Sequence, residues 1–91
     1  MDILHIKDER RFVGIYEGFK CVLQYKIESD NTWSLIHTFV PEELRGKGLA
    51  SLLVEYAAEE ARKLNVKLKP VCSFTKIYFE KNYDKYKDLL K

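Results

Sequence analysis

The chain has 91 residues, 46% of them hydrophobic, which suits one small globular domain over residues 1–91 and excludes a disordered segment. Its 16 basic and 14 acidic side chains leave a net charge of +2, which gives little drive toward nucleic acid or a membrane surface. The sequence has neither the roughly 18 apolar residues of a membrane span nor a signal peptide, so a cytoplasmic protein with reduced Cys21 and Cys72 thiols is expected.

Three strands joined by short turns are expected first. Residues 3–6 and 12–16 can form two of them, and Glu17-Gly18 predicts a tight hairpin turn into the third, at residues 19–28. Alternation in the third strand gives one apolar face, made of Phe19, Cys21, Leu23, Tyr25 and Ile27. Short turns between sequential strands indicate an antiparallel sheet.

A fourth strand is expected over residues 33–40. Regular alternation places Trp33, Leu35, His37 and Phe39 on one face of it. Cys21 is expected in the core, whereas His5 is expected to be an ordinary surface or edge residue.

After the fourth strand, the spacing of apolar residues becomes that of an amphipathic helix. These residues are Leu49, Leu52, Leu53, Tyr56, Ala57, Ala61 and Leu64. Asn65 can end this long helix. Residues 66–71 predict a fifth strand, parallel to the fourth through a right-handed crossover. Residues 75–82 predict a short helix, and residues 84–90 a further helical turn or two. The expected fold is α/β (α+β): a mostly antiparallel twisted sheet with one long and one or two short helices.

The stretch Arg45-Gly46-Lys47-Gly48-Leu49-Ala50 joins the fourth strand to the long helix. Glycines let the backbone approach a ligand closely, and a helix N-terminus supplies free N–H groups and the positive end of the helix dipole. With the charges of Arg45 and Lys47, these features predict a phosphate-binding site. The alternative is a charged loop whose glycines merely allow a turn.

Residues 37–50, which begin His37-Thr38 and end Gly48-Leu49-Ala50, resemble the acetyl-CoA loop of the GNAT N-acetyltransferase superfamily. A second motif, Cys72-Ser73-Phe74 with Tyr78-Phe79 and Asn82, is similar to one in the small members of that superfamily. The resemblance spans about residues 10–90. It implies a GNAT-like fold and an acetyl-CoA-dependent transferase that acts on an amine of a small molecule or a protein.

The resemblance also implies which residues bind coenzyme A. The backbone N–H groups from Arg45 through Gly46, Lys47, Gly48 and Leu49 to Ala50 would hold the pyrophosphate. Phe39 and Val40 would pair with the pantetheine amides, and the fourth and fifth strands would splay apart around the thioester. Ser73 and Asn82 are further candidates, although Asn82 could simply end its helix. No metal site is expected.

The splayed strands would place His37 and Cys72 near the acetyl group. An imidazole exchanges protons near neutral pH, which suits a general base for an amine. The alternative for His37 is a half-buried strand histidine. Tyr78 lies where many superfamily members carry a tyrosine near the CoA sulfur, and there it could donate a proton to the leaving thiolate. Its alternative is aromatic packing beside Phe74 and Phe79.

Cys72 ends the fifth strand directly before a helix, a position that makes a thiol more nucleophilic. Three roles are open for it: a covalent acetyl carrier, a residue that lines the thioester pocket, or a small buried residue.

Compared with full-length superfamily members, the chain starts too late to contain their pair of N-terminal helices. An N-terminally truncated, open acceptor side that a protein chain could reach is therefore expected, in a monomer or weak dimer. Two other functions are open. One is a CoA or acyl-CoA-binding module without catalysis. The other is a protein or nucleic-acid adaptor that uses Tyr25, Trp33 and Tyr83, although the near-neutral charge argues against nucleic acid.

Overall fold

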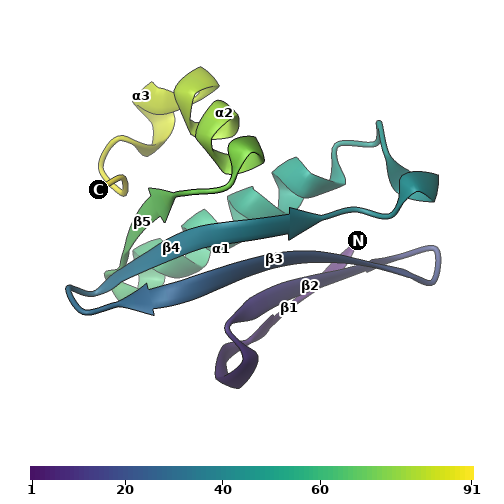
Figure 1. The fold of residues 1–91 in the computed structure, drawn as a ribbon, viewed down its shortest axis with the longest axis horizontal. Helices are drawn as coiled ribbons and strands as arrows, with labels where there is room; N and C mark the ends of the chain where they lie inside the picture. The colour runs from purple at the N-terminus through teal and green to yellow at the C-terminus, as the bar shows by residue number, and fades with distance from the viewer.

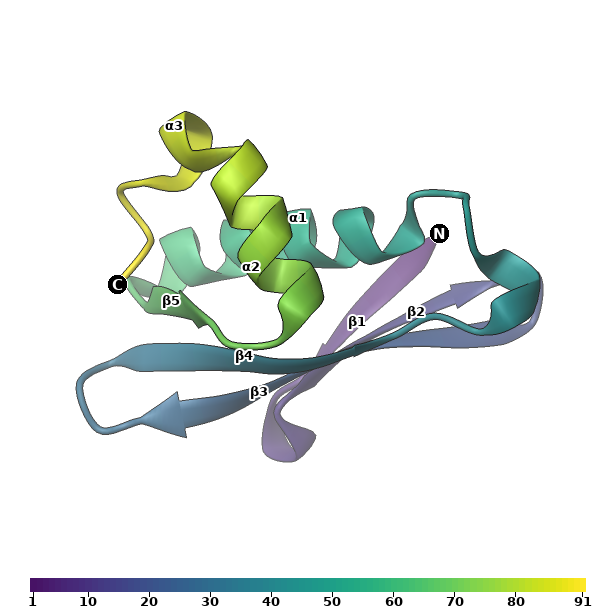
Figure 2. The same ribbon diagram turned by 45° about the horizontal axis from the view of Figure 1, so that its top comes forward.

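The computed structural model describes all of residues 1–91, and it shows one five-stranded sheet with three helices on the same side of it (Figures 1 and 2). In sheet order the strands are β1 (Asp2–Ile6), β2 (Arg11–Tyr16), β3 (Phe19–Glu28), β4 (Thr32–Phe39) and β5 (Lys67–Pro70). The first four pair antiparallel, and β5 pairs parallel to β4. The predicted mixed fold is confirmed. None of the helices is both long and apolar enough to cross a membrane.

The predicted β2–β3 hairpin is confirmed by its backbone. Glu17 and Gly18 both have positive φ, at 50° and 82°, as a two-residue turn between twisted strands requires. In β3, the side chains of Cys21, Leu23 and Tyr25 are buried against the helices. Burial raises the pKa of the Cys21 thiol, which fits its place in the core.

The long helix, α1 (Leu49–Leu64), ends where the sequence predicted. Asn65 adopts the left-handed conformation and caps the helix through its backbone N–H. The buried stripe of α1 consists of Leu49, Leu53, Val54, Ala57, Ala58 and Ala61. Leu52 and Leu64, which the periodicity placed on that stripe, are exposed, because the buried face turns toward Val54 and Ala58 instead.

The C-terminal segment closes one edge of the sheet. After α2 (Ser73–Lys81) and α3 (Tyr83–Tyr86), Leu68 of β5 donates to the carbonyl of Leu89 and accepts from the N–H of Lys91. β1 at the other side is therefore the free edge of the sheet.

A β-bulge in β4 changes the face on which its later side chains lie. Gln24 pairs with His37 but Tyr25 pairs with Leu35, so Ile36 is an extra residue. Trp33 and Leu35 lie on the helix side, as predicted. The prediction that His37 and Phe39 share that face is wrong, because the extra residue reverses the alternation. His37 is exposed on the other side of the sheet, which we call the outer face.

His5 is also placed differently from the prediction. It lies on the edge strand β1, but its side chain is only 5% exposed and points under α1. Its Nε2 lies 2.7 Å from the Tyr25 hydroxyl, and its Nδ1 lies 3.2 Å from a Glu60 carboxylate oxygen. The ring stacks on Phe12 at a centroid distance of 4.1 Å. His5 therefore connects β1 to the helix rather than lying on the surface.

Candidate functional site

A gap opens between β4 and β5 where their pairing ends. The parallel ladder stops at Leu35 and Pro70, and the next two N–H groups, of Val71 and Cys72, both donate to the Leu35 carbonyl at 3.0 Å. β4 then continues through residues 36–39 without a strand on that side. Its free backbone groups there can bond to an extended ligand.

The start of α1 meets this gap. Gly46 and Gly48 have φ of 85° and 73°, values that a residue with a Cβ rarely adopts. Gly48 occupies the position before the helix, and no side chain caps the helix there. The N–H groups of residues 46–51 donate to no protein carbonyl, and they stand at the positive end of a 16-residue helix. This arrangement suits a phosphate group.

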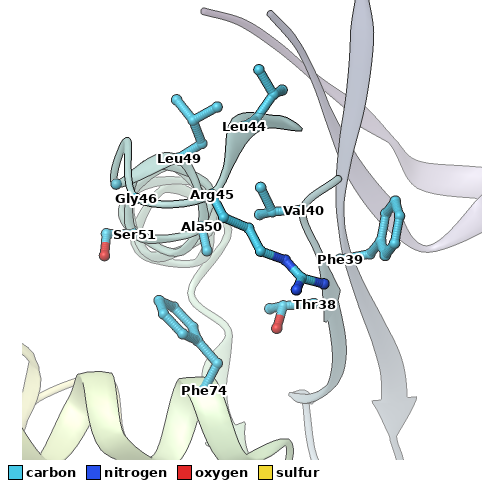
Figure 3. A pocket seen from close by; sticks show the side chains of 11 residues that line it. Thr38, Phe39, Val40, Leu44, Arg45, Gly46, Leu49, Ala50, Ser51 and Phe74 are labelled. Atoms are coloured by element: carbon cyan, nitrogen blue, oxygen red, sulfur yellow. The ribbon is translucent and has the colours of Figure 1, made fainter. Parts of the chain in front are cut away.

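A cavity of about 340 Å³ lies between this helix end, the gap and the start of α2 (Figure 3). It is lined by Thr38, Phe39, Val40, Leu44, Arg45, Gly46, Gly48, Leu49, Ala50, Ser51 and Phe74. In Figure 3 the side chains of Thr38 and Val40 point toward α1, Phe39 points away, and Arg45 extends toward β4. The cavity is therefore lined by apolar side chains on one side and by a cationic group and free backbone N–H donors on the other.

Lys47 does not line the cavity. Its ammonium lies 6.0 Å from the ring centroid of Tyr16 on β2, so of the two predicted cations only Arg45 faces the cavity.

Cys72 is half-buried at the end of the gap. Its Sγ lies 3.2 Å from the Thr75 hydroxyl and 3.9 Å from the Thr38 hydroxyl. The buried Thr75 hydroxyl also donates to the Cys72 carbonyl at 3.0 Å, which fixes the start of α2. The structure thus brings Cys72 to Thr38, a cavity residue, and holds its thiol between two hydroxyl groups.

His37 lies on the outer face, next to Thr38 in the chain, and makes no recorded side-chain bond. The structure does not bring His37 into contact with Cys72. The two residues flank Thr38 instead, with His37 on the outer face and Cys72 toward the helices.

Tyr78 and Asn82 line a second, neighbouring cavity of about 220 Å³. Ser51 and Phe74 line both cavities, so the two are adjacent. The Tyr78 hydroxyl lies 3.3 Å from that of Tyr86, and burial, with this hydrogen bond, raises the pKa of Tyr78. Asn82 donates its side-chain amide to the Tyr78 carbonyl at 2.8 Å. Ser73 is exposed at the first position of α2 and lines neither cavity.

Several lining residues were not among the predicted site residues: Thr38, Leu44, Ser51 and Phe74. Thr38 and Phe74 belong to the two motifs, so the sequence contained a signal for them. Leu44 and Ser51 line the cavity only because the turn η2 (Glu42–Leu44) and the first turn of α1 fold around it, which local pattern does not reveal.

Comparison with known proteins agrees with this geometry. A family model described as GCN5-related N-acetyl-transferase matches residues 11–89. Among solved structures, the chain is similar to a GCN5-like protein from Staphylococcus aureus, solved in solution by NMR, to which N-acetyltransferase activity is attributed. The two chains share 32% sequence identity with a TM-score of 0.77, and the match covers 99% of this chain and 87% of the other. The similarity includes every element around the cavity.

Proposed function

Because the chain belongs to the GCN5-related N-acetyltransferase family, we propose that it transfers the acetyl group of acetyl-CoA to an amine. The observation that carries this proposal is the uncapped start of α1, whose free N–H groups border a cavity that leads to the β4–β5 gap. The phosphate groups of a ligand can bond to these N–H groups, and a long polar chain attached to them can bond to the unpaired backbone of β4 in the gap.

In this proposal, the free N–H groups of Gly46, Lys47, Gly48, Leu49 and Ala50 hold the pyrophosphate. The backbone N–H of Arg45, which the resemblance also implied, donates to the Glu42 carbonyl instead, so Arg45 contributes through its guanidinium, which adds a charge-assisted contact. The backbone of Phe39 and Val40, beyond the last β5 partner, bonds the pantetheine arm. The free side-chain oxygen of Asn82, beside the second cavity, is a further candidate for contact with the cofactor. Ser73 is a candidate from its motif alone, since it lines neither cavity.

Acetyl-CoA supplies an acetyl group on a thioester. A bond forms between the acceptor nitrogen and the acetyl carbon as the carbon–sulfur bond breaks, so the amine must lose a proton and the CoA sulfur must gain one. We assign the first proton to His37, whose exposed ring is open to an amine on the outer face. We assign the second to Tyr78, because a tyrosine hydroxyl carries its proton at neutral pH and this side chain lines the cavity next to the cofactor cavity.

Cys72 has two open roles in this scheme. It either lines the thioester site, with its thiol held by Thr75, or accepts the acetyl group on Sγ with release of CoA as the thiol. Intact mass after mixing with acetyl-CoA distinguishes them. An acetyl adduct that disappears in Cys72→Ser indicates the carrier, and no adduct during turnover indicates the lining residue.

A calorimetric titration with acetyl-CoA tests the proposal. Saturable binding is expected, and Gly46→Glu/Gly48→Glu should abolish it because carboxylates then occupy the phosphate position. Gly18→Glu, in the β2–β3 turn, introduces the same side chain at an equally positive φ and should retain binding. No binding at millimolar acetyl-CoA contradicts the proposal. Binding without turnover of any amine would instead identify a CoA-binding module.

A further inference from the structure

The outer face of the sheet carries an apolar row that is exposed at both ends. No helix covers this face in Figure 2. The strand register places Leu4, Val13, Val22 and Phe39 side by side on four neighbouring strands. Leu4 is 60% exposed and Phe39 47% exposed at the two ends of the row, whereas Val13 is buried and Val22 half-buried between them. Contiguous exposed apolar patches on a protein surface often mark interaction sites.

A second row lies beside the first and ends at His37. It contains Ile6, Arg11, Gln24 and His37 in register. Arg11 is two strands from His37, which corresponds to about 10 Å across the sheet. Its Nε is buried and lies 3.3 Å from a Glu9 carboxylate oxygen, while the side chain as a whole is 39% exposed. The two Nη groups of Arg11 form no recorded hydrogen bond or ion pair, so they are the donors available for a further carboxylate.

The charge around these rows is mainly positive. Lys26 and Lys69 occupy the next row, on either side of Ser34, and neither forms a recorded ion pair. Of the acidic residues around the outer face, Glu28 accepts a hydrogen bond from Ser34, Glu9 pairs with Arg11, and Asp2 lies at the far end of β1. A partner with carboxylates is thus the complementary one.

We propose that the outer face is where the acceptor docks, and that the acceptor amine belongs to a protein segment with apolar and acidic side chains. This rests on the proposed acetyl transfer. The cofactor would fill the helix side of the β4–β5 gap, which leaves the outer face, where His37 is exposed, for the amine. Small-molecule sites are concave pockets, whereas this face is an open sheet surface that matches an extended chain. The amine nitrogen gains the acetyl group and gives its proton to His37.

The first test compares three acceptors with the wild-type protein and acetyl-CoA. Two are nine-residue peptides with a blocked N-terminus and one central lysine, flanked by Leu and Asp in one and by Leu and Arg in the other. The third is n-butylamine, which represents the lysine side chain alone. We expect kcat/KM for the Leu/Asp peptide to exceed both others by about tenfold or more. Equal or faster transfer to either of the others, or transfer to none, overturns the inference.

The second test uses variants on the outer face. Leu4→Lys and Arg11→Glu should each raise KM for the Leu/Asp peptide about tenfold while the Kd for acetyl-CoA stays constant. Leu64→Lys on α1 makes the same change as Leu4→Lys, and Lys87→Glu the same charge reversal as Arg11→Glu, at exposed positions away from the outer face; both should leave KM unchanged. Unchanged KM in the outer-face variants overturns the inference.

The outcomes separate the two proposals. Loss of acetyl-CoA binding in the wild-type protein contradicts the proposed function itself. Acetyl-CoA binding with no peptide preference contradicts only the acceptor surface. A dimer in sedimentation at assay concentrations that dissociates in Leu4→Lys would assign the outer face to a second copy of the chain, and so also overturns the inference.

Discussion

Replacing His5 with alanine should destabilise the protein strongly, although the residue lies on the edge strand. The side chain is 5% exposed, stacks on Phe12 and meets the edge of Trp33 at 5.4 Å. A neutral ring satisfies both neighbours when Nδ1–H donates to Glu60 and Nε2 accepts the Tyr25 hydroxyl proton. Burial raises the pKa of Tyr25, so its hydroxyl keeps the proton that it donates.

The magnitude follows from two losses. Removal of a buried ring costs about 2–5 kcal/mol through lost contacts and the cavity. Leaving the buried Tyr25 hydroxyl without a partner costs roughly 1–3 kcal/mol, part of which the new cavity can offset with water. We expect about 4 kcal/mol in total, a large share of the ~5–14 kcal/mol typical of a chain of this size.

Urea unfolding followed by fluorescence measures this loss. His37→Ala is the matched control, because the only other histidine is exposed on the outer face and should change the free energy of unfolding by less than about 0.5 kcal/mol. His5→Phe keeps the ring but not the hydrogen bonds, and should lose about 1–3 kcal/mol. A loss below about 1 kcal/mol in His5→Ala would refute the reasoning, since that is the effect expected of an exposed edge residue.

Three further predictions concern the site and its surroundings. His37→Ala should lower kcat about 10²- to 10⁴-fold in a steady-state acetylation assay while the Kd for acetyl-CoA stays constant, and an unchanged kcat would remove His37 as the base. Thr75→Val should lower the free energy of unfolding in urea by about 1–2 kcal/mol because it removes the hydroxyl bonds to Cys72, whereas Thr75→Ser should largely retain stability. The Arg62 hydrogen bond lowers the pKa of Asp88, so Asp88→Asn should be less stable than wild type at neutral pH. This difference should shrink as the pH falls through the lowered pKa of Asp88 and vanish once the carboxyl is protonated in the folded protein; a difference that persists in acid contradicts the assignment.

Local sequence signals predicted most of the fold. The two-residue turn at Glu17-Gly18, the ten-residue alternation of β3 and the left-handed cap at Asn65 each need only neighbouring residues, and each is confirmed. The parallel β5 follows from the crossover rule.

Local sequence signals did not predict the bulge in β4. Trp33 to Val40 alternates well enough for a regular strand, and nothing local identifies Ile36 as an extra residue. The bulge depends on how β4 pairs with β3, which is a tertiary property. Its effect on function is large, because it puts Thr38 in the cavity and His37 on the outer face.

The contacts of the His5 and Tyr78 side chains could not be predicted from local sequence either. The partners of His5 are 20 and 55 residues away, so a polar residue on a short edge strand gave no sign of burial. The motif containing Tyr78 identified its position, but the hydrogen bond to Tyr86 depends on how α3 packs. The predicted roles of His37, Cys72 and Tyr78 remain predictions.

The most direct test of the central claim is an NMR titration of the ¹⁵N-labelled protein with acetyl-CoA. The account predicts saturable shifts of the backbone amides of residues 45–51 and of Thr38, Phe39 and Val40, because these groups border the cavity and the gap. Amides of the β3–β4 turn at residues 29–31 should stay in place. Shifts confined to that turn, or no shifts at millimolar acetyl-CoA, would contradict the assignment of the start of α1 as the cofactor site.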